Sequence, residues 1–169
     1  VARMARLLGC AAQIFVPVGT AEARIAAIAG EGADVIVVDG SYDDAVARSA
    51  ETADSGWLVI SDTSWPGYAA IPGRVIEGYG TIFAEIDAVL AQRNEDRPDV
   101  VLVQMGVGAL AAAAIGHYRR EAGGTRPMII GVEPTRAACV LASLAAGALT
   151  AVPGPHDSVM AGLNCGLPS

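Results

Sequence analysis

The residues of this sequence that are best suited to chemistry follow an apolar run of strand length. Val100 to Val103 are aliphatic throughout, and the chain then passes Gly106 and Gly108 into an alanine-rich stretch of helical composition. A strand that turns at glycines into a helix directs backbone N–H groups and the positive end of the helix dipole at one place, which suits a phosphate group. Spacing alone leaves two interpretations open, because a tight strand-to-helix turn in any α/β fold also favours glycine.

The same stretch differs from a dinucleotide site. Ala111 stands where the G-x-G-x-x-G pattern has its third glycine, and no acidic residue closes the next strand at the usual distance. A dinucleotide is therefore the weaker phosphate ligand. All 11 basic residues are arginine, and a chain without lysine has no side-chain amine that could link to an aldehyde cofactor.

Polar side chains also follow another predicted strand. Ser61-Asp62-Thr63-Ser64-Trp65 comes at the carboxyl end of the run 57–60, where α/β proteins place their ligands. The carboxylate of Asp62 could receive a substrate ammonium group, or Asp62 could be an ordinary turn or cap aspartate. Glu133, after the apolar run 128–132, leaves a similar choice between facing a cofactor cleft and capping the next helix.

The remaining polar residues indicate no catalytic or metal site. His117 and His156 have no partner at triad or ligand spacing, so we expect both at the surface. Tyr42-Asp43-Asp44 opens a predicted helix, where acidic side chains favour the helix dipole. Three cysteines without zinc-type spacing favour a reducing cytoplasm: Cys10, Cys139 and Cys165.

Composition excludes several classes of partner. The chain has 53% hydrophobic and 17% charged residues, a formal net charge of -7 and no basic cluster. These values are typical of a globular protein and argue against nucleic acid or an anionic membrane as a partner. The apolar run 100–116 is not expected to span a membrane, because it contains Gln104 and three glycines and changes from strand to helix period.

Short apolar strands alternate with helices along the whole chain. Strands that are apolar on both faces and separated by helices predict a parallel sheet covered on both sides, that is, a three-layer α/β fold. Residues 1–8 have the spacing of the second half of a helix, and residues 166–169 are turn residues. We therefore expect the fold to be incomplete at both ends. The predicted strands are 13–16, 34–38, 57–60, the apolar run that begins at Val100, and 128–132, and the predicted helices are 1–8, 21–29, 42–53, 72–92, the alanine-rich stretch after the two glycines, and 137–146.

Four segments together resemble the pyridoxal-phosphate enzymes of the tryptophan-synthase-β type (fold type II), and within them the diaminopropionate ammonia-lyase branch. They occur in the family's order over nearly the whole chain. The string D-T-x-W-x-G-Y-x-x-I-P is specific to that branch, whereas the G-V-G loop is shared more widely. The segments are Ser41 to Asp44, Asp62 to Pro72 with Glu77 to Tyr79, Gln104 to Ala111, and Met160 to Gly166.

The resemblance implies a cofactor, a substrate class and site residues. Pyridoxal 5'-phosphate would be the cofactor, and a small amino acid, 2,3-diaminopropionate, would lose ammonia and, after hydrolysis, give pyruvate and a second ammonia. Asp62 and Thr63 would bind the substrate. A threonine or serine dehydratase of the same fold and a non-catalytic binding remnant are the alternatives. The cofactor phosphate would be held by Gly106, Val107, Gly108, Ala109 and Leu110.

The resemblance also implies what this segment lacks. The family's Schiff-base lysine would lie upstream of Val1, so we expect no catalytic residue here and an inactive segment. Residues 1–66 would belong to the smaller domain and residues 67–169 to the larger domain, which carries the phosphate loop, of a homodimeric enzyme. Cys139 and Cys165 would lie around the same cleft, either paired or as separate buried thiols. Leu167 stands where the family usually has glutamate, which weakens the prediction of the exact substrate.

Overall fold

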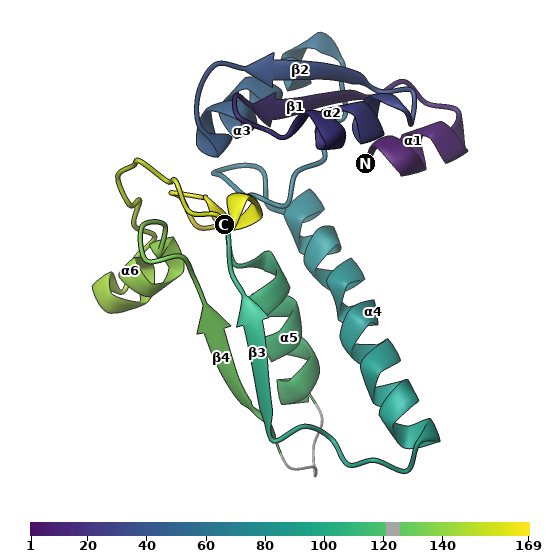
Figure 1. The fold of residues 1–169 in the computed structure, drawn as a ribbon, viewed down its shortest axis with the longest axis vertical. Helices are drawn as coiled ribbons and strands as arrows, with labels where there is room; N and C mark the ends of the chain where they lie inside the picture. Colours follow the sequence, from purple (N-terminus) through teal and green to yellow (C-terminus); the bar gives the residue numbers. More distant parts are fainter. Residues whose placement is uncertain (121–125) are drawn as a thin grey trace. The chain divides into compact units, whose positions relative to one another are not determined.

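The computed structural model describes residues 1–120 and 126–169 (Figure 1). These residues form two compact units, Val1–Ser61 and Asp62–Ser169. In both units, a helix connects two parallel strands, which is the unit that the alternation of strands and helices predicts.

The first unit is built around two parallel strands, β1 (Gln13–Pro17) and β2 (Asp34–Val38). Their register runs from Gln13 opposite Asp34 to Pro17 opposite Val38. The unit also contains α1 (Ala2–Leu8), α2 (Glu22–Ala29), α3 (Tyr42–Ala50) and the short 3-10 helix η1 (Glu51–Ser55).

A capping box begins α3. The backbone N–H of Asp44 donates to Oγ of Ser41 at 3.2 Å, and the backbone N–H of Ser41 donates to Oδ2 of Asp44 at 2.7 Å. Hydrogen bonds from the side chain and the backbone of Ser41 lower the pKa of Asp44. The acidic start of this helix is therefore structural, as its sequence indicates.

The predicted strand 57–60 is wrong. This stretch forms no strand in the described chain, and Leu58 is 73% exposed. A strand forms only where a second strand pairs with it, and the sheets of the described residues do not include this apolar run. The predicted helix 42–53 also ends early, at Ala50, and continues as η1 to Ser55.

The second unit contains the long helix α4 (Ala70–Gln92), β3 (Val100–Gln104), α5 (Ala109–Arg120) and β4 (Met128–Val132). The helix α6 (Cys139–Ala146) and the 3-10 turn η2 (Ala161–Leu163) follow. β3 and β4 pair in parallel, with Val100 opposite Met128 and Gln104 opposite Val132. α4 begins before Pro72, which the first turn of a helix accepts. The prediction of an α/β fold with parallel strands is confirmed.

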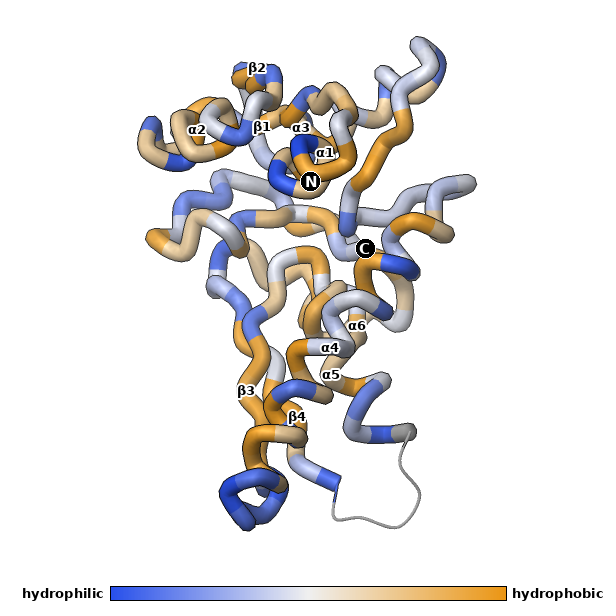
Figure 2. The backbone as a smooth tube through the Cα atoms, turned by 90° about the vertical axis from the view of Figure 1, so that its right-hand side faces the viewer, coloured by the Kyte–Doolittle hydropathy of each residue, from blue (hydrophilic) through white to orange (hydrophobic). Residues whose placement is uncertain are grey.

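The core of the second unit lies between α4, α5 and one face of the β3–β4 pair. Phe83 from α4 packs with Ala113, Ala114 and Tyr118 from α5, all of them at least 95% buried. The opposite face of the strands is open, since Leu102 is 68% exposed. Figure 2 shows the hydrophobic colouring along both strands.

His117 is not the isolated surface residue that the sequence predicts. Its Nε2 lies 2.8 Å from Oδ2 of Asp87 on α4, and the same oxygen accepts a hydrogen bond of 2.8 Å from Arg97. The side chains of Asp87 and His117 are only 15% and 18% exposed. The pair connects α4 with α5 across 30 positions of sequence, which no local spacing rule detects.

The apolar run 100–116 forms a strand, a loop and most of a helix, as predicted. Among the helices that the structure describes, none is long and apolar enough to cross a membrane.

Candidate active site

The glycine loop (Gly106–Leu110) connects β3 to α5. Met105, just before it, donates from its backbone N–H to the carbonyl of Val132 at 2.9 Å, which extends the β3–β4 pairing by one residue. The backbone N–H of Ala112 donates to the carbonyl of Gly108 at 2.9 Å, closing the first turn of α5. The N–H groups of Ala109 and Leu110 precede that bond, so the helix itself offers them no acceptor.

The two glycines of this loop serve different local needs. Gly108 has φ 97°, a conformation that other residues rarely adopt. Gly106 has no such constraint, but a Cβ atom there would lie 3.1 Å from the sulfur of Cys165 and 3.4 Å from the carbonyl oxygen of Gly162. Gly106 therefore allows the C-terminal segment to pack closely, and Gly108 allows the chain to turn into α5.

Two helix N-termini meet near this loop and differ in charge. At α6, the carboxylate of Glu133 accepts hydrogen bonds of 2.9 Å from the N–H groups of both Val140 and Leu141. The choice left open by the sequence is therefore settled in favour of helix capping. The first turns of α5 and α6 both contain no acidic residue. The two positive helix ends differ in that the carboxylate of Glu133 neutralises that of α6.

Glu133→Gln should destabilise the chain because glutamine has one acceptor oxygen where glutamate has two. We expect the free energy of unfolding to fall by about 1–2 kcal/mol, measured by urea denaturation. Glu51→Gln is the matched control, since Glu51 makes one exposed ion pair with Arg48 at 2.9 Å, and such pairs contribute little. Equal effects of the two substitutions would contradict the capping role of Glu133.

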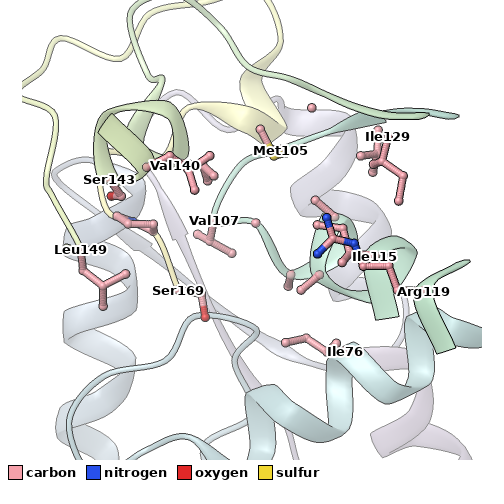
Figure 3. Close-up of a pocket in the computed structure, with 18 of the residues that line it drawn as sticks. Ile76, Met105, Val107, Ile115, Arg119, Ile129, Val140, Ser143, Leu149 and Ser169 are labelled. Carbon is pink, nitrogen blue, oxygen red and sulfur yellow. The ribbon is translucent and has the colours of Figure 1, made fainter. Parts of the chain in front are cut away.

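A cavity of about 1060 Å³ extends from the glycine loop along α5. Figure 3 shows Val140, Ser143 and Leu149 on one side of it and Ile115 and Arg119 on the other. Val107, Gly108 and Ala109 contribute to its wall, but Asp62 and Thr63 are not among its lining residues. The cavity therefore reaches the predicted phosphate loop without including the predicted substrate-binding residues.

The substrate segment (Asp62–Ser64) lies against the C-terminal residues of the same unit. Oγ of Ser169 accepts a hydrogen bond of 2.9 Å from the backbone N–H of Ser64 and donates one of 3.1 Å to the backbone carbonyl of Asp62. Thr63, between them, is only 3% exposed. The backbone N–H of Ser169 in turn donates to the carbonyl of Val107 at 2.8 Å. The two predicted binding segments are thus connected through one serine.

The carboxylate of Asp62 also acts on Tyr79 of α4. Burial and the negative charge of Asp62 both raise the pKa of the Tyr79 phenol. The phenol therefore stays protonated at neutral pH and remains a possible hydrogen-bond donor near this carboxylate.

A turn with two stacked aromatic rings follows the substrate segment. Trp65 and Tyr68 exchange backbone hydrogen bonds of 2.8 and 3.2 Å, and their rings stack with centroids 4.0 Å apart. Gly67 has φ 87° between them. This positive φ is the reason for a glycine at that position of the specific string.

Two thiols approach the glycine loop. Cys139, fully buried, donates from Sγ to the carbonyl of Gly106 at 3.5 Å, and the sulfur of Cys165 lies beside the same glycine. Neither is in a disulfide. The segments of both cysteines therefore meet at this loop, with the two residues as separate buried thiols.

Ser169 is the residue that the sequence analysis missed. A single serine in a turn-rich segment carries no motif, and its partners lie 105 and 107 positions away. Only the folded chain brings its hydroxyl to the substrate segment.

The family model for pyridoxal-phosphate dependent enzymes matches residues 1–169, the whole chain. The chain belongs to this family. Diaminopropionate ammonia-lyase of Escherichia coli K12 is 38% identical over 172 residues, which cover all of this chain and 42% of that enzyme. A biosynthetic L-threonine dehydratase of Mycobacterium tuberculosis is 35% identical over 149 residues, covering 84% of this chain and 31% of the enzyme.

Solved structures of the family agree with these matches. Escherichia coli diaminopropionate ammonia-lyase in complex with an aminoacrylate-PLP azomethine reaction intermediate superposes with a TM-score of 0.89 at 36% identity, covering 99% of this chain and 42% of that one. Threonine deaminase isoform 2 of Solanum lycopersicum gives a TM-score of 0.74 at 28% identity, covering 99% and 46%. The chain thus spans less than half of these relatives.

The residues of this family member fit the phosphate end of pyridoxal phosphate. The glycine loop has no polar side chain of its own, turns at a positive φ and leads into a helix whose first turn lacks acidic residues. These features suit a dianionic phosphate. The described residues contain no group of three or more His, Cys, Asp or Glu side chains that could hold a metal ion.

Proposed function

We propose that this chain supplies the phosphate-binding loop and the substrate segment of a diaminopropionate ammonia-lyase. That enzyme would eliminate ammonia from 2,3-diaminopropionate, and hydrolysis of the product by water would give pyruvate and a second ammonia. One observation carries the proposal: Ser169 forms hydrogen bonds both to the glycine loop, which suits a phosphate, and to the substrate segment Asp62–Ser64. Identity of 38% to the Escherichia coli enzyme over the whole chain supports this substrate class.

The proposal extends to the domain organisation and the setting of the enzyme. Residues 1–66 would belong to its smaller domain and residues 67–169 to its larger domain. The full-length enzyme would be a homodimer, as the family resemblance implies. The odd number of cysteines, without zinc-type spacing, favours a cytoplasmic location.

The residues of the chain would divide the work between binding and orientation. When bound, pyridoxal phosphate supplies an electron sink for the carbanion formed at the substrate Cα. The N–H groups of Gly106, Val107, Gly108, Ala109 and Leu110 would hold the phosphate oxygens and fix the position of the ring. The carboxylate of Asp62 would bind the ammonium groups of the substrate, and Thr63 would support it from its buried position.

Ammonia release by the full-length enzyme tests this function. We expect kcat/KM for 2,3-diaminopropionate to exceed that for threonine and serine by at least about a hundredfold, because a site that pairs with a second ammonium group rejects substrates that lack it. A preference for threonine or serine would instead favour the dehydratase alternative, which the match to threonine dehydratase supports. Retained cofactor without any ammonia release would indicate a binding protein.

Asp62→Asn should selectively weaken the use of 2,3-diaminopropionate. Removing the negative charge while keeping the shape is expected to lower kcat/KM by about tenfold to a hundredfold, through loss of a charge-assisted hydrogen bond. Asp157→Asn is a suitable control, since Asp157 forms an exposed ion pair with Arg136 at 2.9 Å. An unchanged kcat/KM in Asp62→Asn would leave Asp62 as a turn residue.

A further inference from the structure

Three of the five residues of the C-terminal segment Cys165–Ser169 are buried in the second unit, whereas Leu167 is exposed. Cys165, Gly166 and Pro168 are buried, and the carbonyl of Gly166 accepts a hydrogen bond of 2.8 Å from the backbone N–H of Val152. The sulfur of Cys165 lies against Gly106 at the start of the glycine loop. Packing of the residues before Ser169 therefore fixes the position of its backbone and side chain.

Ser169 uses its backbone and its side chain on different partners. Its backbone N–H binds the carbonyl of Val107 in the glycine loop at 2.8 Å. Its hydroxyl binds the two residues that flank Thr63. It donates to the carbonyl of Asp62 at 3.1 Å and accepts from the N–H of Ser64 at 2.9 Å. The hydroxyl oxygen of Ser64 also lies 3.0 Å from the hydroxyl oxygen of Ser169.

These contacts fix a distance that the reaction depends on. The glycine loop would determine where the cofactor lies, and the carboxylate of Asp62 would determine where the substrate amino groups lie. Errors of about 1 Å between such groups lower catalytic rates substantially. Ser169 joins the main chains of both segments, and Figure 3 shows it beside Val107 at the cavity wall.

We propose that Ser169 is a positioning residue, which holds the substrate segment in register with the glycine loop through its hydroxyl. This inference rests on the proposed function of the two segments. It assigns the side chain of Ser169 to substrate positioning, whereas its backbone N–H supports the loop whatever the side chain is.

The division between backbone and side chain makes the proposal testable in the full-length holoenzyme. Ser169→Ala removes the hydroxyl but leaves the N–H that binds Val107. We expect kcat/KM for 2,3-diaminopropionate to fall by about tenfold to a hundredfold through loss of two hydrogen bonds. The dissociation constant of pyridoxal phosphate should change by less than about threefold, because the backbone bond to the loop remains. Ser169→Thr, which keeps a hydroxyl, should recover most of the loss.

Two comparisons separate positioning from a general loss of stability. Ser158→Ala removes a half-buried hydroxyl of the same C-terminal region that accepts from the N–H of Met160 at 3.1 Å, and it should leave kcat/KM within about twofold. In an Asp62→Asn background, Ser169→Ala should have little further effect, because both changes act on the same contact with substrate.

Several results would overturn the proposal. One is an equal loss of cofactor affinity, substrate use and thermal stability in Ser169→Ala; another is independent, multiplying effects of Ser169→Ala and Asp62→Asn. If the wild-type enzyme prefers threonine or serine, kcat/KM of the variants relative to wild type is measured with that substrate. The role of Ser169 is then still tested even though the proposed activity is wrong. If no amino acid reacts, amino-acid binding is followed by the change in cofactor absorbance, and an unchanged affinity in Ser169→Ala refutes the positioning role.

Discussion

Replacing Gly108 by aspartate in the full-length enzyme is expected to weaken binding of pyridoxal phosphate by about a hundredfold or more. Gly108 has φ 97°, so any side chain there strains the turn. The carboxylate would also lie at the N-terminus of α5, where the phosphate is proposed to bind. The negative charges of the carboxylate and the phosphate would repel each other strongly when they are neighbours. The measurement is cofactor content after desalting, together with a titration of the apoenzyme with pyridoxal phosphate.

Two further variants assign the effect to its cause. Gly108→Asn introduces a side chain of nearly the same shape as aspartate but without its charge. The difference in cofactor affinity between the two variants therefore measures repulsion of the phosphate. Gly19→Asp introduces the same charge at another glycine of positive φ, 87°, with no neighbour within 4 Å of an added Cβ. It should leave cofactor binding unchanged. Full cofactor content in Gly108→Asp would mean that the two glycines serve only the turn and the packing of the chain.

The strand-loop-helix stretch could be predicted because its signals are local. β3 (Val100–Gln104) begins where the apolar run begins, and α5 begins at Ala109, directly after the second glycine. The change of hydrophobic period and the two glycines lie within one short window. The substrate segment, in contrast, was identified by resemblance to a family string, since its spacing alone left an ordinary turn aspartate equally open.

Features that depend on distant partners could not be predicted in this way. The run 57–60 has the composition of a buried strand, but a strand forms only where a second strand pairs with it, and none of the described strands does so. His117 pairs with Asp87 because α4 and α5 pack side by side, which sequence spacing does not encode. The hydroxyl of Ser169 finds its partners through the whole fold of the second unit.

Glu133 illustrates a choice that only geometry could settle. Its place at the end of β4 was compatible with a cofactor cleft and with a helix cap. Both of its carboxylate oxygens are used by the first N–H groups of α6, which accounts for the residue as a structural one. This cap neutralises the N-terminus of α6, whose own first turn, like that of α5, contains no acidic residue.

The 169-residue chain alone is expected to be catalytically inactive and to form no lasting covalent link with pyridoxal phosphate. An enzyme that links this cofactor to itself needs a lysine amine, and all 11 basic residues here are arginine. A guanidinium group stays protonated and cannot replace that amine. Among the described residues, Leu102 on β3 and Met128 on β4 are 68% and 63% exposed, so this face of the strand pair contributes little packing behind the loop. Free cofactor should therefore bind weakly as well.

The test is to mix the purified chain with pyridoxal phosphate, desalt it, and record its visible spectrum and its ammonia release from 2,3-diaminopropionate. Pyridoxine 5'-phosphate, which has the phosphate but no aldehyde, serves as the control ligand for the loop by itself. We expect no cofactor band after desalting and no ammonia above the free-cofactor background. A band that survives desalting would refute the prediction and point first to the α-amino group of Val1. Acetylation of that amine should then abolish the band, because no lysine is present to take over the link.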